Sequence, residues 1–232
     1  MKFNKIMCIS DLHLSEEATV LNENFLALMG RIPESYEALF ILGDLFDWWP
    51  GDDAINAYYK TIASALRALH CPVFFLPGNR DYLPNKKWLK LANTSRLPDT
   101  HSILVANKKV TFLHGDELCT EDVGYQKLRK ITRKYWLQWL YQKIPLSLKN
   151  KIAKQFNRSS LKKKPVSNRV YAPVESAINQ IVKQEQCDIL VHGHIHQVGI
   201  YPKNSYTRVV LPDWRPNHYQ SLTITKERIV LN

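Results

Sequence analysis

Aspartate, asparagine and histidine side chains recur at five places in this chain, each beside a glycine or in closely spaced pairs. Asp11 and His13 are two residues apart, and His194 and His196 repeat that spacing. Residues two apart on an extended backbone point to the same face, so each pair is expected to address one site. The other three places are Gly43-Asp44, Gly78-Asn79-Arg80-Asp81 and His114-Gly115.

Together these places offer imidazole, carboxylate and amide ligands. Such a mixed N/O set suits Mn²⁺, Zn²⁺ or iron better than Ca²⁺. Seven ligands are too many for one tetrahedral ion and fit two ions that share a bridging carboxylate. Two metal ions roughly 3.5–4 Å apart can activate water and hold a phosphoryl group for in-line attack. Each piece alone would usually be a turn or a satisfied polar pair, but their combination favours a metal centre. The candidate ligands are Asp11, His13, Asp44, Asn79, His114, His194 and His196.

Short apolar runs stand immediately before these residues and are predicted to be strands. In layered α/β proteins, ligands gather at the carboxyl ends of strands, which is where all five places fall. Helices are expected over residues 22–30 and 55–69, a hairpin around Asn107-Lys108, and closing strands over 208–211 and 221–231. The predicted strands that end in ligands are residues 6–9, 38–42, 73–76, 110–113 and 189–191.

The composition describes one α/β-sized globular domain, taken as residues 1–232. The chain has 232 residues, of which 45% are hydrophobic and 23% are charged. Eight glycines, twelve prolines and four cysteines exclude a collagen, a low-complexity chain and a disulfide miniprotein. No stretch approaches the roughly 18 apolar residues of a membrane span, and the N-terminal apolar run carries Asp11 and His13, unlike a signal peptide. The widely spaced cysteines are expected to be reduced in a cytoplasmic protein.

Positive charge is concentrated in one segment. The net charge is +11, yet residues 123–174 contain fourteen Lys or Arg and no Asp or Glu, while the rest of the chain carries 18 basic and 21 acidic residues. This excess predicts an anionic partner: a nucleic acid, a phosphorylated substrate or an anionic membrane. A solvated helical face is the simpler alternative.

Within this segment, residues 125–157 have helical periodicity. Apolar side chains fall at steps of three and four, which predicts an amphipathic helix. Residues 125–172 are therefore expected to form a helical insertion that caps the core and accepts apolar chains, although the apolar stripe could simply pack on the core. The stripe consists of Leu128, Ile131, Tyr135, Trp136, Trp139, Leu140 and Ile144.

The order Asp-x-His, Gly-Asp, Gly-Asn-x-Asp, His and Gly-His-x-His resembles the calcineurin-like metallophosphoesterases. The resemblance implies an α/β fold: a β-sandwich flanked by helices, with a basic amphipathic helical insertion in this chain. It also implies two metal sites bridged by Asp44. One site would use Asp11, His13, Asp44 and His196, and the other Asp44, Asn79, His114 and His194. His192 lies outside the pattern and is expected to be a neutral imidazole supporting a strand end.

Longer stretches, at residues 43–53, 78–81, 114–122 and 208–211, are similar to the UDP-2,3-diacylglucosamine hydrolases of lipid A synthesis in Gram-negative bacteria. This resemblance implies hydrolysis of UDP-2,3-diacylglucosamine to UMP and 2,3-diacylglucosamine 1-phosphate, usually with Mn²⁺, by attack on the α-phosphorus. It also implies peripheral attachment to the anionic cytoplasmic face of the inner membrane. Neither a nucleic acid nor an obligate protein partner is expected.

The resemblance also suggests roles for single residues. Asn79, Arg80 and His114 are expected to be catalytic. Arg80 can bind a phosphate through two parallel N–H groups and stabilise the charge that develops in the transition state. Residues 161–175 depart from the family pattern, so the head-group contacts there are open. Two alternative functions are considered. The first is a nuclease or other phosphodiesterase built on the same core, and the second is a scaffold protein that binds no metal. The expected substrate contacts are Asn79, Arg80, Asp122, Ser160, Lys164, Ser167 and His194.

Overall fold

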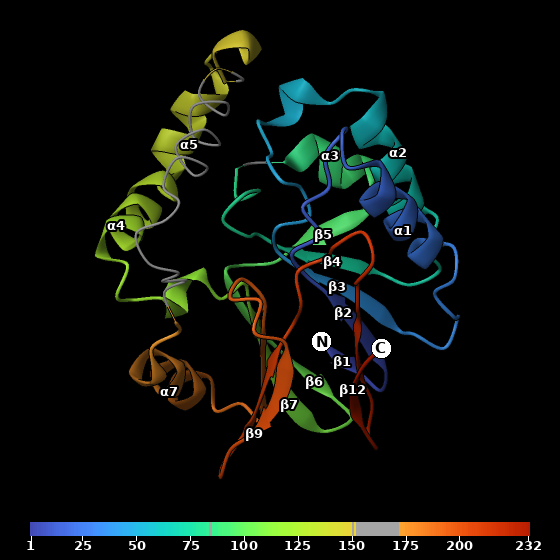
Figure 1. The fold of residues 1–232 in the computed structure, drawn as a ribbon, viewed down its shortest axis with the longest axis vertical. Coiled ribbons are helices and arrows are strands. Elements are labelled where there is room, and N and C mark those ends of the chain that lie inside the picture. Colours follow the sequence, from blue (N-terminus) through green and yellow to red (C-terminus); the bar gives the residue numbers. More distant parts are fainter. Residues whose placement is uncertain (84, 150, 152–171) are drawn as a thin grey trace.

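Two six-stranded β-sheets form the centre of the protein (Figure 1). The computed structural model describes residues 1–83, 85–149, 151 and 172–232. The first sheet has the strand order β1-β6-β7-β8-β10-β9 and the second β12-β11-β2-β3-β4-β5. The strands are β1 Lys2–Phe3, β2 Ile6–Ile9, β3 Ala38–Leu42, β4 Val73–Leu76, β5 Thr94–Arg96, β6 Thr100–Val105, β7 Lys108–Leu113, β8 Ile189–His192, β9 Gly199–Pro202, β10 Thr207–Val210, β11 Leu222–Ile224 and β12 Ile229–Leu231.

The two sheets pack face to face because alternate residues of their apolar strands point to opposite sides. In β3, Phe40 belongs to the cluster between the sheets, where it contacts Phe112 of β7 at a ring distance of 4.7 Å. Its neighbours Leu39 and Ile41 belong to a different cluster on the outer side. Strands β2, β3 and β4 carry almost only apolar residues, as expected for parallel strands buried on both faces.

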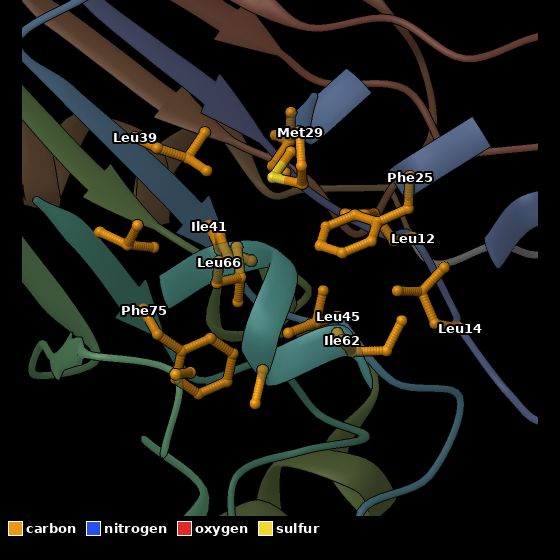
Figure 2. Close-up of a cluster of buried hydrophobic side chains, with 14 of the residues drawn as sticks. Leu12, Leu14, Phe25, Met29, Leu39, Ile41, Leu45, Ile62, Leu66 and Phe75 are labelled. Atoms are coloured by element: carbon orange, nitrogen blue, oxygen red, sulfur yellow. The ribbon is translucent and has the colours of Figure 1, made fainter. Parts of the chain in front are cut away.

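Helices cover the outer faces of both sheets. The second sheet is covered by α1 Thr19–Met29, α2 Ala57–Arg67 and α3 Lys86–Leu91, and Figure 2 shows Phe25 and Ile62 from these helices in one buried cluster with Ile41. The first sheet is covered by α7 Glu175–Glu185, whose Ile178 packs on Leu190 of β8. Two short 3₁₀ turns, Asp52–Ala54 and Asp116–Leu118, lie in the loops after β3 and β7. The predicted sandwich flanked by helices is confirmed.

Helices α4 Val123–Thr132 and α5 Tyr135–Gln142 project from this body (Figure 1). The single amphipathic helix expected here is wrong in one respect, because the helix is interrupted between Thr132 and Tyr135. The expectation that the apolar stripe could pack on the core also differs from the structure, in which most of its members are exposed, Trp136 to 60% and Trp139 to 53%. No described helix is long and apolar enough to cross a membrane.

Candidate metal centre

All seven candidate ligands follow the carboxyl ends of central strands. Asp11 and His13 come after β2, Asp44 after β3, Asn79 after β4, His114 after β7, and His194 and His196 after β8. Because β2, β3 and β4 are parallel, and β7 and β8 are parallel, these ends meet at one edge of each sheet. The fold thus brings together residues that lie as far apart in the sequence as Asp11 and His196.

The backbone at five of the seven candidate ligands is left-handed. The φ angles are +54° at Asp11, +50° at His13, +53° at Asp44, +65° at His194 and +54° at His196. The extended backbone expected for the two closely spaced pairs is therefore wrong, because both pairs lie beyond their strands in tight loops. A non-glycine residue with positive φ is strained, and such strain clusters at functional sites.

Asp11, His13 and His196 form one compact group. One ligand atom from each lies within 4.8 Å of the others. Nε2 of His196 is 3.4 Å from Oδ1 of Asp11, while Oδ2 of Asp11 accepts the backbone N–H of His194 at 2.9 Å and the Ser10 hydroxyl. Nδ1 of His13 is buried and has no hydrogen-bond partner in the described part of the chain. A buried, unpaired imidazole nitrogen beside a carboxylate suits a metal ligand.

A second group gathers around Asn79. Oδ1 of Asn79 is 2.9 Å from Nε2 of His114 and 2.9 Å from Nδ1 of His194. Nδ1 of His114 donates to the carbonyl oxygen of Leu42 at 2.9 Å, so the other ring nitrogen of the neutral imidazole carries a lone pair. That lone pair faces the Asn79 oxygen, and Oδ2 of Asp44 lies 3.6 Å away. These electron-rich atoms repel one another unless a proton or a cation lies among them.

The ionisation of the group agrees with that requirement. Burial raises the pKa of Asp44 to about 7. Burial acts to lower the pKa of His114, but the charges of Asp44 and Asp11 outweigh it and raise that pKa to about 9. In the metal-free protein a protonated His114 thus offsets carboxylate charge that a bound divalent ion would otherwise offset. The residues present therefore fit a metal centre, and Asp11 and Asp44 both contribute carboxylates to the group that contains His114.

Asp81 organises the loops that carry the ligands, a role that the sequence analysis did not assign. Its buried carboxylate accepts backbone N–H groups from Leu45 at 2.8 Å, Gly78 at 2.9 Å and Asp44 at 3.3 Å. It therefore ties the loop after β3 to the loop after β4. Its place two residues after Asn79 in the motif was the signal for a function here, but only the fold reveals that it binds backbone rather than metal.

Glycine is required where these loops touch. A Cβ atom on Gly78 would lie 2.1 Å from Oδ1 of Asp44, and one on Gly193 would lie 2.0 Å from Oδ2 of Asp11. Neither position can accept a side chain without displacing a ligand carboxylate. The glycines beside the ligands in the sequence are thus explained by close approach of backbone to ligand.

Arg80 lies at the rim of the site. Its backbone N–H donates to Oδ1 of Asp44 at 2.8 Å, while its guanidinium Nη1 lies 3.7 Å from Oδ1 of Asp47. The Arg80 side chain is 35% exposed. Its charge is therefore accessible to an anion approaching the metal centre.

His192 behaves as the sequence suggested. It is fully buried, its Nδ1 donates to the carbonyl oxygen of Gly193 at 2.9 Å, and its Nε2 accepts from Nε of Arg208 at 2.9 Å. Burial and the Arg208 charge lower its pKa to about 3, so the imidazole is neutral. It supports the turn that leads to His194.

The expected substrate contacts are only partly visible. Oδ1 of Asp122 accepts the backbone N–H of Tyr125 at 2.9 Å and so begins α4 as an N-cap. Ser160, Lys164 and Ser167 lie outside the described residues.

The comparison with protein families agrees with this geometry. The family model of the calcineurin-like phosphoesterases matches residues 4–198. The chain belongs to this family. It is also 38% identical over 215 residues to the UDP-2,3-diacylglucosamine hydrolase of Histophilus somni (strain 129Pt), with 90% of this chain and 92% of that protein covered. The protein of that name from Haemophilus influenzae (strain PittGG) is 35% identical, with 90% of each chain covered.

Solved structures share the fold at low identity. A novel archaeal phosphodiesterase is 12% identical, with a TM-score of 0.53 over 98% of this chain and 99% of that one. Vacuolar protein sorting 29 from Cryptosporidium parvum is 14% identical, with a TM-score of 0.50 over 98% and 89% of the two chains. These likenesses concern the fold alone.

Proposed function

We propose that this phosphoesterase hydrolyses UDP-2,3-diacylglucosamine to UMP and 2,3-diacylglucosamine 1-phosphate, by attack of water on the α-phosphorus. The observation that carries the proposal is the ligand cluster beside Arg80, in a chain that matches hydrolases of that name over nine-tenths of its length. Such a product pair belongs to lipid A synthesis.

We further propose that the centre holds two divalent ions, Mn²⁺ being the ion we expect. Asp11, His13, Asp44 and His196 would hold one ion, and Asp44, Asn79, His114 and His194 the other. When bound, two such ions lower the pKa of water and offset the charge of the phosphoryl group. The hydrogen bond from Arg80 to Asp44 orients the carboxylate, and that from His114 to Leu42 fixes its imidazole tautomer.

The protein's own residues bind and orient the pyrophosphate. The Arg80 guanidinium would pair with phosphate oxygens through two parallel N–H groups and neutralise charge that grows during the reaction. Oδ1 of Asn79 lies 2.9 Å from Nδ1 of His194, so both side chains can contact a phosphate bound at the second metal position. Asp122, Ser160, Lys164 and Ser167 are the further head-group contacts we propose.

The segment 125–172 is proposed to be a cap that receives the acyl chains, inserted into the single domain of residues 1–232. Half of the large apolar side chains that are exposed in the described residues lie between Val123 and Leu148. So much exposed apolar surface, most of it on the two short helices α4 and α5, is typical of a binding surface. Lysines are interleaved with it, and Nζ of Lys143 lies 5.3 Å from the Trp139 ring centroid.

This mixture of aromatic and basic side chains also suits the surface of an anionic membrane. Basic residues near such a surface contribute about 1 kcal/mol each. We therefore propose peripheral attachment to the cytoplasmic face of the inner membrane, through residues such as Trp136, Lys134 and Lys143.

The deciding experiment uses metal-stripped protein with UDP-2,3-diacylglucosamine, with Mn²⁺ restored in one arm. Formation of UMP and lipid monophosphate in that arm alone would support the substrate and the metal requirement, and ¹⁸O in UMP would support attack on the α-phosphorus. Absence of turnover, together with good hydrolysis of bis-p-nitrophenyl phosphate or single-stranded DNA, would leave a phosphodiesterase or nuclease instead.

A further inference from the structure

Helix α4 turns one face toward the metal-ligand loops. Tyr125, Arg129 and Arg133 are spaced by four residues, so they lie along one side of the helix. The side chains of Arg129 and Arg133 are only 17% and 14% exposed, although both belong to the segment with the excess positive charge. These two arginines therefore face the core and not a membrane or nucleic acid.

Each residue of this row reaches a group next to a candidate ligand. Nη2 of Arg133 donates to the carbonyl oxygen of Gly78 at 2.9 Å, immediately before Asn79. Nε of Arg129 donates to Oδ2 of Asp116 at 2.8 Å, two residues after His114.

Tyr125 makes the third connection. Its hydroxyl donates to Oδ2 of Asp116, and its ring faces the His194 ring at an interplanar angle of 22° with a centroid distance of 6.5 Å. The row thus touches the surroundings of Asn79, His114 and His194. In the described part of the chain it makes no hydrogen bond or ion pair with Asp11, His13 or His196.

Asp99 joins the two arginines into one unit. Its Oδ2 accepts from Nη2 of Arg129 at 3.0 Å, and its Oδ1 accepts from Nη1 of Arg133 at 2.8 Å. Asp116, by contrast, is fully buried; Arg129 at 2.8 Å and Arg133 at 3.8 Å compensate its charge, and the Tyr125 hydroxyl donates a hydrogen bond to it. Removing one partner from a buried charge is costly, so the geometry of this network is held firmly.

We propose that Tyr125, Arg129 and Arg133 are positioning residues, which fix the Asn79, His114 and His194 half of the metal centre and attach the cap helix to it. The other half is fixed without them, through Ser10, Gly43 and Asp44. The position of the cap helix and the geometry of the Asn79, His114 and His194 half of the metal centre are therefore coupled through one face of α4. This inference rests on the proposed metal centre but not on the identity of the substrate.

The test is a titration of metal-stripped protein with Mn²⁺ by calorimetry, comparing R133Q with K130Q. Lys130 lies on α4 and is exposed, so K130Q removes the same charge from the same helix without disturbing the row. Residues that orient metal ligands affect metal affinity about 10–100-fold. We expect R133Q to weaken one of two binding events by that factor and to leave the other within about twofold, whereas K130Q changes neither.

Two further variants separate positioning from misfolding. D99N leaves the charge of Asp116 compensated and should weaken the same metal-binding event less than R133Q does. R133K should recover part of the loss, because lysine can reach one of the two acceptors of Arg133, the carbonyl oxygen of Gly78 or the Asp99 carboxylate. Circular dichroism and melting temperature verify that each variant is folded. Equal weakening of both events, or equal behaviour of R133Q and K130Q, would overturn the inference.

Turnover of bis-p-nitrophenyl phosphate gives a readout that is independent of the lipid substrate. R133Q should lower kcat at least tenfold, because the ligands around Asn79 are no longer held in place. KM should be nearly unchanged, because the small diester does not need the cap. If the wild-type chain takes up one ion only, the dinuclear proposal fails, and the inference then holds only if R133Q lowers this kcat more than K130Q does.

Discussion

The backbone N–H of Arg80 donates to Oδ1 of Asp44 at 2.8 Å. The residue that we expect to grip the phosphate therefore also orients the carboxylate that we propose as the shared metal ligand, through its main chain and not through its guanidinium. The two tasks can be separated, because a substitution at Arg80 removes the side chain and leaves the N–H in place.

The variant R80A should retain metal and lose catalysis. Loss of one positioned donor to developing charge costs about 10²–10³ in kcat. The variant D44A should lose metal as well as activity. Metal content by mass spectrometry and kcat with the UDP-lipid measure both, and a metal-free R80A or a D44A with near-normal turnover would refute this division of roles.

Asp81 offers a test of loop organisation. In D81N, an amide NH₂ replaces either Oδ2, which accepts the backbone N–H of Leu45, or Oδ1, which accepts that of Gly78, so in either case a buried donor faces a donor. We expect a loss of about 1–3 kcal/mol in the free energy of unfolding, together with weaker metal binding. Denaturant unfolding of the metal-free protein measures the first quantity. D47N, at a carboxylate that is 41% exposed and whose ion pair with Arg80 is 3.7 Å long, is the matched control for stability and should change it by less than about 0.5 kcal/mol.

Metal binding should release protons. In the metal-free protein, the charges of Asp44 and Asp11 outweigh burial and hold the pKa of His114 at about 9, so the imidazole is protonated at neutral pH. A metal ion binds only the unprotonated nitrogen. Affinity for Mn²⁺ should therefore rise with pH from 7 to about 9 and level off above. Calorimetry in buffers of different ionisation enthalpy counts the protons, and a pH-independent affinity over this range would contradict the prediction.

The exposed tryptophans of α5 should act on lipid substrates only. Burying a large apolar side chain is favourable by about 1.5–3 kcal/mol, so the double substitution of Trp136 and Trp139 by serine should lower kcat/KM for the UDP-lipid by at least about tenfold. Hydrolysis of bis-p-nitrophenyl phosphate should be unchanged. The control is Y201S, which removes an exposed aromatic ring of β9. Equal losses on both substrates would indicate damage to the metal centre instead.

The central strands were predictable from the sequence, whereas the short edge strands and the conformation of the loops were not. The boundaries of β2, β3 and β4 match the predicted runs, because apolar strands buried on both faces have an unbroken sequence pattern. Short edge strands such as β1, β5 and β9 were missed, since two to four residues carry little pattern. Helices α3 and α7 were also missed.

Two local predictions, the unbroken amphipathic helix and the extended backbone at Asp11 and His13, failed because tertiary contacts determine the conformation there. Nothing in the sequence around Arg133 and Lys134 signals a helix end. In the structure, α4 ends where Arg133 binds Gly78 and Asp99. The left-handed backbone at Asp11 and His13 was equally invisible, because these residue types do not require it. Hydrogen bonds from their N–H groups to the carbonyl oxygens of Gly43 and Asp44 hold it in place.

Strand β2 has neighbours from opposite ends of the sequence. Cys8 pairs with Phe40 on one side and with Leu222 on the other. The strand that presents Asp11 and His13 therefore remains an unpaired edge until a segment more than 200 residues later has joined it. Pairings of such long sequence separation form slowly and expose apolar edges in the meantime. During synthesis the metal centre is thus among the last parts of the molecule to mature, and premature termination before β11 should yield aggregation-prone chains instead of a partly active enzyme.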